Sequence, residues 1–155
     1  MGEHKIYVHD GHSKFDINLF QPIRVKEHFN KPIGGLWASP TSSTYTWEQW
    51  CLDNNFNYTI GEDKYFQGEQ FKFKLKDGAR LLSITSSKQL DDLPQIKDDI
   101  TSSVFKILDF MTLQEEYDAI EVLISNDHQL YWDLYGWDID SIIVMNPDVI
   151  EVVQM

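Results

Sequence analysis

The sequence predicts a single α+β domain over residues 1–155, with a mostly antiparallel, split β-sheet core and a few flanking helices. Segments typical of strands and of helices are grouped along the chain rather than strictly alternating, which argues against a doubly wound parallel sheet. The chain is also 42% hydrophobic and 14% aromatic. That composition suffices to bury a core at this length and excludes an intrinsically disordered chain.

The first part of the chain predicts two strands, a long loop and a helix. Residues 5–9, KIYVH, are a β-branched and aromatic run that ends at a turn, and residues 35–39, GLWAS, form a short apolar run. Residues 10–35 are polar, with proline and glycine breakers, and predict a long loop of the kind that often carries function. Residues 41–56 place tryptophan and cysteine at helical spacing, which predicts a helix.

The strongest signal for a β-hairpin lies in residues 71–84, FKFKLKDGARLLSI. Apolar residues and lysines alternate through the first six positions, as in a half-buried strand. Asp77 and Gly78 supply a turn, and Leu81, Leu82 and Ile84 supply the return strand. We therefore expect these two strands to pair with each other.

The second part of the chain predicts further helices and the remaining strands. Residues 86–93 are expected to form a short helix, and residues 98–117 form an amphipathic helix with apolar side chains at helical spacing. Residues 128–137 predict an aromatic helix or turn. The remaining strands are expected at residues 117–125, 140–146 and 149–153.

The formal net charge of −12 is distributed unevenly along the chain. Residues 1–90 carry 11 Lys and Arg against 10 Asp and Glu, a net of +1, whereas residues 91–155 carry 2 against 15, a net of −13. A basic nucleic-acid groove is therefore not expected as the main binding surface. The acidic segment 91–155 could dock on a basic protein partner or keep the protein soluble, and charge alone does not separate these functions.

Composition gives no sign of a membrane segment, a disulfide or a metal site. No apolar run approaches the roughly 18 residues that a membrane-spanning helix needs, and no secretory signal is visible. The lone Cys51 cannot form an internal disulfide, which fits the cytoplasmic location that we expect. His4, His9 and His12 lack a second ligand cluster that would complete a zinc site, so no metal is expected.

Trp37 is the tryptophan with the clearest functional interpretation. It follows a glycine pair and precedes a turn rich in serine and threonine. An aromatic side chain at such a place can stack on a flat heterocycle, or it can fill the core. Both interpretations are open from the residues alone.

Three segments, in chain order, resemble the ADP-ribosyltransferases of the His-Tyr-Glu type, which include the poly(ADP-ribose) polymerases. Residues 5–11, KIYVHDG, resemble the family's opening strand, which ends in His-Gly. Residues 32–51, PIGGLWASPTSSTYTWEQWC, resemble its Gly-x-Gly-Ile-Tyr-Phe-Ala block and the helix that follows. Residues 140–153, DSIIVMNPDVIEVV, resemble the late strand that carries the catalytic Glu. The resemblance covers about a third of the chain and implies an ADP-ribosyltransferase-like fold.

The resemblance also implies roles for individual residues. His9 falls on the family His, which bonds the ribose on the nicotinamide side, and Trp37 falls where a Tyr stacks on nicotinamide. Asp140 or Ser141 takes the position of the Glu, so Asp140 would stabilise the developing cation. The residues that would bind the cofactor are Asp10, Gly11, Ser42, Ser43 and Ser141.

The expected substrate is therefore NAD or a related nucleotide. The resemblance implies cleavage of the nicotinamide–ribose bond through an oxocarbenium-like state, followed by transfer to a protein or nucleic-acid acceptor or by hydrolysis. One alternative is a non-enzymatic acidic protein that docks on a basic partner or mimics nucleic acid. Another is a degenerate transferase fold that only binds nucleotide. Convergence of His9, Trp37 and Asp140 on one cleft would favour the enzyme, whereas scattered positions would favour the acidic binding protein.

Overall fold

Seven strands form one sheet in the computed structural model of this protein. The structure describes residues 5–10, 12–24, 32–43, 59–60, 63–64, 70–96, 106–134, 137 and 139–153. The order across the sheet is β6 (Leu81–Ile84), β7 (Ala119–Val122), β8 (Ser141–Val144), β2 (Leu36–Pro40), β1 (Tyr7–Asp10), β5 (Gln70–Leu75) and β9 (Ile150–Val153). All neighbouring strands are antiparallel except β6 and β7, which are parallel. The α+β class and the mostly antiparallel sheet are thereby confirmed.

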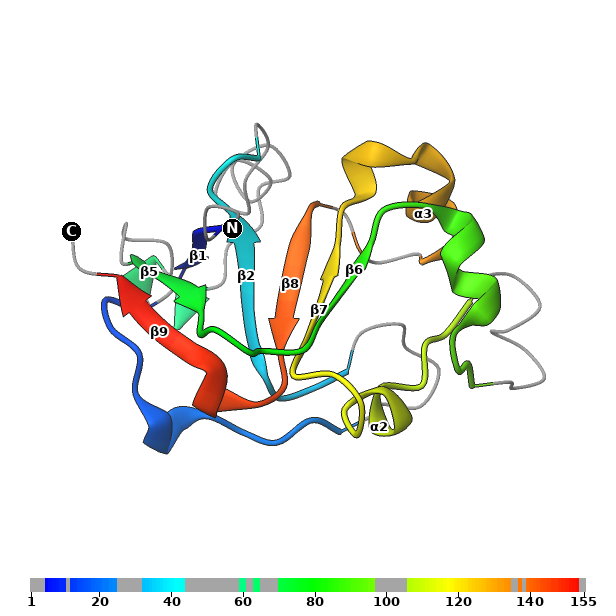
Figure 1. Cartoon of the computed structure of the whole chain (residues 1–155). Helices are drawn as coiled ribbons and strands as arrows, with labels where there is room; N and C mark the ends of the chain where they lie inside the picture. The colour runs from blue at the N-terminus through cyan, green and yellow to red at the C-terminus, as the bar shows by residue number, and fades with distance from the viewer. Residues whose placement is uncertain are drawn as a thin grey trace.

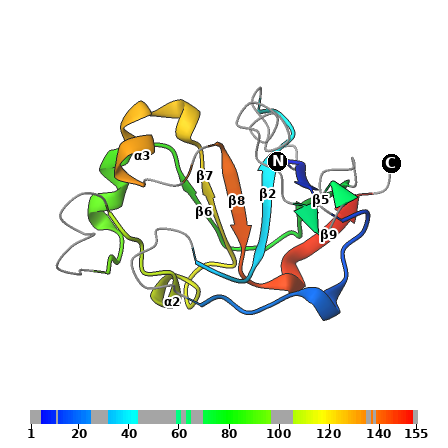
Figure 2. The same ribbon diagram turned by 180° about the vertical axis from the view of Figure 1, so that it is seen from behind.

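The helical segments are short, and most of them lie toward the β6 end of the sheet (Figure 1). Figure 1 shows β2, β8, β7 and β6 side by side, with β1, β5 and β9 gathered beyond β2 and most helical segments beyond β6; Figure 2 shows the same division from behind. The helices are η1 (Ile17–Leu19), η2 (Ser87–Asp92), α2 (Phe110–Leu113), η4 (Ile124–Asn126), α3 (His128–Asp133) and η5 (Pro147–Val149). A separate two-stranded ladder is formed by β3 (Thr59–Ile60) and β4 (Asp63–Lys64).

The predicted hairpin over residues 71–84 is wrong, although both of its strands exist. β5 pairs with β1 on one side and with β9 on the other, so both of its edges are occupied. β6 instead lies at the far edge of the sheet beside β7. The alternation along β5 holds, because Phe71 and Phe73 are buried while Lys72 and Lys74 are partly exposed.

Asp118 holds the start of β6 against the start of β7. Its carboxylate accepts hydrogen bonds from the Arg80 backbone N at 2.8 Å and the Arg80 guanidinium at 2.9 Å. Its own backbone N donates to the Arg80 carbonyl at 2.7 Å. The hydrogen bond from the Arg80 side chain is the main reason that the pKa of Asp118 falls to about 2. These bonds place Arg80 beside β7 and explain why the chain leaves β5 after the Asp77-Gly78 turn.

The helix predictions had mixed outcomes. The short helix expected over residues 86–93 is confirmed as η2, and the aromatic segment 128–137 contains α3. The long amphipathic helix over 98–117 is wrong in its described part, because residues 106–109 are not helical and α2 has only four residues. There Leu108 pairs with Gln95 in an isolated β-bridge, and Asp109 caps the start of α2. The helix expected over 41–56 lies outside the described residues apart from the turn at 41–43.

The sheet curls so that distant strands meet across one face. The Tyr7 hydroxyl on β1 donates to Glu121 on β7 at 2.7 Å, although β2 and β8 lie between these strands. Three strand spacings in a flat sheet amount to about 14 Å, and side chains stand roughly perpendicular to a sheet. The bond therefore requires β1 to bend over toward β7, which makes the face that carries Tyr7 concave.

Each face of the central strands is buried in its own hydrophobic cluster. Leu36, Ala38 and Ile142 belong to the cluster on the concave face, together with Phe73 of β5. Ile120 and Ile143 belong to the cluster on the other face, which also contains residues of η2, α2 and α3. Side chains alternate between the faces of a strand, so the face of each site residue follows from its position.

Candidate functional site

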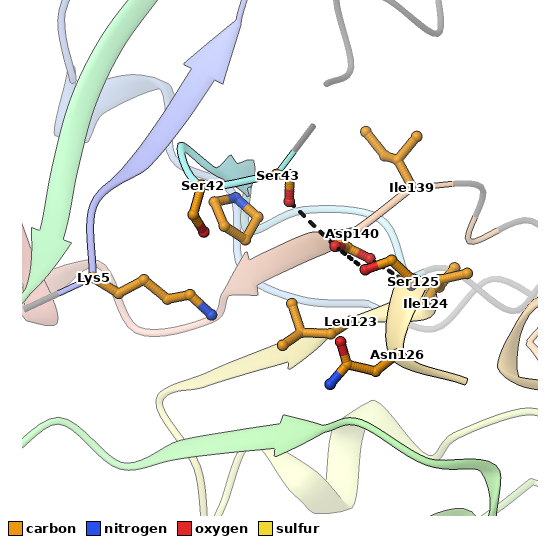
Figure 3. Close-up of a pocket in the computed structure, with 10 residues that line it drawn as sticks. Lys5, Ser42, Ser43, Leu123, Ile124, Ser125, Asn126, Ile139 and Asp140 are labelled. Carbon is orange, nitrogen blue, oxygen red and sulfur yellow. Dashed lines mark hydrogen bonds between the residues drawn. The ribbon is translucent and has the colours of Figure 1, made fainter. Parts of the chain in front are cut away.

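The ends of four strands surround a cavity of about 410 Å³. Antiparallel pairing places the start of β1 beside the end of β2, and the start of β8 beside the ends of β2 and β7. The segments that adjoin these ends line the cavity (Figure 3). A volume of this size lies within the usual range for small-molecule sites, which also favour the mouths of curled sheets.

The cavity is lined by both apolar and polar side chains. Pro40, Ile124 and Ile139 are buried and contribute apolar surface, as does the partly buried Leu123. The polar lining residues are Lys5, Ser42, Ser43, Ser125, Asn126 and Asp140. A few polar groups converging over an apolar surface are typical of a ligand site, because the apolar part gives affinity and the polar groups fix orientation.

Asp140 is the acidic group of this cavity. Its carboxylate accepts hydrogen bonds from the Ser125 backbone N at 2.8 Å, the Ser125 hydroxyl at 2.7 Å and the Ser43 hydroxyl at 3.2 Å. All three donors are neutral, and no cation pairs with Asp140 within the part of the chain that the structure describes. The carboxylate is thus held in a fixed orientation while its negative charge remains available to a ligand.

The turn after β2 is fixed against the segment before β1. Thr41 donates to the Ile6 carbonyl through its backbone N at 2.9 Å and through its hydroxyl at 3.1 Å. The Ser43 backbone N then closes a turn onto the Pro40 carbonyl at 3.1 Å. These bonds set the position of Ser43, whose hydroxyl reaches Asp140 across 97 residues of sequence.

Lys5 forms the opposite wall of the cavity. Its ammonium donates to Glu121 on β7 at 2.8 Å, and this carboxylate also accepts from Tyr7 at 2.7 Å and from Ser83 at 2.9 Å. Glu121 is only 2% exposed. Burial, with the hydrogen bond to Glu121 and its charge, raises the pKa of Tyr7 well above its usual value.

His9 lies on the concave face but lines a second, smaller cavity of about 120 Å³ beside Leu36 and Phe71. Its Nδ1 lies 2.7 Å from the Trp37 carbonyl, and because a carbonyl only accepts, Nδ1 carries the proton. Its Nε2 then accepts from Nδ1 of His12 at 3.0 Å. Burial lowers the pKa of His9, and the nearby His12 acts in the same direction.

Trp37 lies on the other face of the sheet from His9. Its ring packs against Trp137, with ring centroids 5.0 Å apart, and it joins the hydrophobic cluster beneath α2 and α3. It is partly buried and lines neither of the two cavities. The ring of Trp37 therefore fills the core, as one of the two interpretations predicted. Its backbone carbonyl accepts the hydrogen bond from His9.

The structure brings together some predicted site residues and separates others. Ser42, Ser43 and Asp140 share the larger cavity. His9, Trp37 and Asp140 share neither the larger nor the smaller cavity described above, so the convergence that would favour the enzyme is not found there.

The remaining predicted binding residues lie elsewhere. The Ser141 hydroxyl is buried and donates to the Ile139 carbonyl at 3.0 Å. Asp10 accepts from the Gln70 side chain at 2.6 Å, and Gly11 lies outside the described residues.

Sequence reasoning missed Lys5, Ser125 and Asn126. Ser125 is the last residue of the predicted strand 117–125 and Asn126 follows it, and polar residues at the end of a strand are a usable signal for a site at that sheet edge. Lys5 gave no such signal, because its position depends on Glu121, which is 116 residues away.

The described residues contain no group of three or more His, Cys, Asp or Glu side chains placed to hold a metal ion. Within the same residues, no helix has the length and apolar character needed to cross a membrane. None of the family models compared matches the chain, and searches of curated proteins and of solved structures gave no significant match.

Proposed function

We propose that the protein binds NAD in the cavity beside Asp140 and cleaves the bond between nicotinamide and ribose. The observation that carries the proposal is the carboxylate of Asp140, which is held by three neutral donors in a cavity of ligand size and has no described cationic partner. Such a carboxylate is suited to a positive charge that develops during a reaction.

The arrangement of the three family-like segments supports the proposal. They lie on β1, β2 and β8, which are adjacent in the sheet. Ser43 bonds to Asp140, which links the second segment with the third, and His9 bonds to the Trp37 carbonyl, which links the first with the second. Segments far apart in sequence thus lie on adjacent strands of the sheet.

The chemistry follows from the charge of Asp140. As the C–N bond to nicotinamide lengthens, its electron pair leaves with nicotinamide and positive charge builds on the ribose carbon and ring oxygen. A carboxylate held beside that ribose lowers the energy of this state, because its hydrogen bonds are already in place. The ribose carbon then bonds to the oxygen of water or to an acceptor nucleophile, which loses a proton.

The positions of His9 and Trp37 narrow this proposal. The resemblance assigns them to the ribose and to nicotinamide, but in the structure His9 lines the smaller cavity and the Trp37 ring packs in the core. The proposal therefore places the reacting ribose beside Asp140 and Ser43 and assigns no contact with it to His9 or Trp37. It assigns His9 only to fixing β1 against β2.

Nicotinamide release from NAD tests the proposal. We expect the wild-type protein to release nicotinamide and Asp140→Asn to slow release by about 100-fold, a typical effect of removing one charge-stabilising group. Asparagine keeps the shape of the side chain and an acceptor for Ser125. Asp148→Asn, an exposed aspartate on η5, is the matched control and should release nicotinamide at the wild-type rate.

The products separate the possible outcomes of this experiment. Free ADP-ribose indicates hydrolysis, whereas ADP-ribose attached to a protein or nucleic acid indicates transfer. Binding of NAD without release would indicate the degenerate nucleotide-binding fold. If the wild-type protein neither binds NAD nor releases nicotinamide, the proposed function is wrong.

A further inference from the structure

We infer that the cavity beside Asp140 takes a phosphate-bearing ligand whose phosphate is bound by Lys5, with Glu121 as the residue that positions Lys5. This inference rests on the proposed function for the site of binding and goes beyond it by assigning a phosphate subsite. The chemical class of ligand is a nucleotide with a diphosphate group.

The ammonium of Lys5 has hydrogen-bond donors left for a ligand. A lysine ammonium has three donors, and the bond to Glu121 at 2.8 Å uses one of them. The Lys5 side chain is 38% exposed and lines the cavity, whereas Glu121 does not line it. A phosphate can therefore approach the ammonium from the cavity while Glu121 holds it from behind.

Glu121 fixes Lys5 more firmly than a surface partner could. Its carboxylate is buried and accepts from Tyr7 and Ser83 as well as from Lys5. Because a buried charge is costly without a partner of opposite sign, Lys5 is held in this ion pair rather than extending into solvent. The flexible side chain is thus ordered before any ligand arrives, which reduces the entropy lost on binding.

The cavity has charges of opposite sign on facing walls. Figure 3 shows Lys5 entering from one side and Asp140 on the other, with Ser42, Leu123 and Asn126 around the space between them. A ligand that is anionic at one end and becomes cationic at the other fits this arrangement. A ribose joined to a diphosphate on one side and to a cationic leaving group on the other has these properties.

Binding of two probes to matched variants tests the inference. ADP-ribose carries a diphosphate, and nicotinamide riboside carries none. We expect Lys5→Met to weaken ADP-ribose binding by about 10- to 100-fold, as for the loss of a charge-assisted hydrogen bond, and to change nicotinamide riboside binding by less than about twofold. Lys74→Met removes a lysine that is ion-paired with Glu151 on β9 and should change neither affinity.

Two further variants separate positioning from general stability. Lys5→Met alone leaves the buried Glu121 carboxylate without its cationic partner, which could destabilise the fold. The double variant Lys5→Met with Glu121→Gln removes both charges and so avoids this effect. Glu121→Gln alone should weaken ADP-ribose binding, but it should have no further effect once Lys5 is methionine. A merely structural role of Glu121 would instead weaken binding of both probes in both backgrounds.

Each outcome decides between the claims. If Lys5→Met weakens both probes equally or neither, Lys5 does not bind phosphate. If the wild-type protein binds neither probe, this inference and the proposed function are both wrong. If ADP-ribose binds through Lys5 but NAD releases no nicotinamide, the phosphate subsite stands and the proposed cleavage does not.

Discussion

His9 makes the stability of the folded protein depend on pH. Burial lowers its pKa from the usual 6.5, so below about pH 6.5 the unfolded chain takes up a proton that the folded protein does not. The stability that neutral His9 contributes is therefore fully present above pH 6.5. It declines as the pH falls from 6.5 toward the folded pKa. Protonation leaves the bond from Nδ1 to the Trp37 carbonyl in place, but it removes the acceptor that Nε2 offers to His12.

We expect His9→Asn to reduce the loss of stability between about pH 7.5 and about pH 5.5, because asparagine keeps an N–H donor but does not titrate there. Urea unfolding at the two pH values measures the effect. His128→Asn replaces an exposed histidine on α3 and is the control, for which the wild-type pH dependence should persist. An unchanged pH dependence in His9→Asn would show that another group is responsible.

Gly34 determines how the chain enters β2. Its φ of +87° is in the left-handed region, and a Cβ at this position would overlap the Pro22 carbonyl. Gly78, in the turn after β5, has a similar φ of +85° but open space around it. The two glycines therefore separate the cost of backbone conformation from the cost of a steric clash.

We expect Gly78→Ala to lower the free energy of unfolding by about 1 kcal/mol, the cost of a left-handed residue with a side chain. Gly34→Ala should lower it by about 3 kcal/mol or more, because the backbone at Pro22 must also move. Urea unfolding of both variants makes the comparison. Equal losses would mean that the segment around Pro22 gives way without cost.

Local sequence patterns predicted strands well and their partners poorly. The runs that became β1, β2, β5, β6, β7, β8 and β9 were all predicted as strands, because alternation and β-branched residues are local signals. The pairing of β6 with β7 depends instead on Asp118 and Arg80, which are 38 residues apart. Similarly, the apolar spacing through residues 98–117, which includes Ile107 and Leu108, predicted a helix. Both of these side chains are instead buried in a non-helical segment, in which Leu108 forms a β-bridge with Gln95.

The sequence predicted some residues of the candidate site but not how they are grouped in space. Asp140, Ser42 and Ser43 were identified from the sequence, because they lie in segments with a family-like pattern. The sequence did not predict that the Trp37 ring and His9 lie apart. The prediction placed both in one pocket without considering which face of the sheet each side chain occupies. Lys5 could be found only once the curl of the sheet had brought β1 to Glu121.

At the scale of the whole molecule, several acidic side chains of segment 91–155 accept hydrogen bonds within the fold rather than forming one acidic surface. Asp118 and Glu121 are buried in polar networks, Asp109 and Asp127 cap helices, and Asp140 accepts from Ser125. The exposed acids that remain near one another include Glu115 and Glu116, which follow α2. Asp98 and Asp99 lie outside the described residues.

We expect Glu115→Lys with Glu116→Lys to leave nicotinamide release within about twofold of wild type, because both side chains are exposed and away from the cavity. The same double variant tests the alternative of an acidic binding protein. If that alternative holds, charge reversal should lower the salt concentration at which the protein elutes from immobilised polylysine. Slower nicotinamide release in the variant would place this surface in the reaction.

The hydrogen bond between Tyr7 and Glu121 has a consequence for the order in which the protein folds. It joins positions 114 residues apart, and the cavity walls likewise come from residues 5–43 and 123–140. Contacts between such distant positions form slowly, because a long stretch of chain must be ordered before they yield any stabilisation. During synthesis the contact between Tyr7 and Glu121 can therefore form only after β7 has been made, although β1 can pair with β2 before then. The pocket, which is lined by Leu123 and Asp140 as well as by Lys5, forms later than the pairing of β1 with β2.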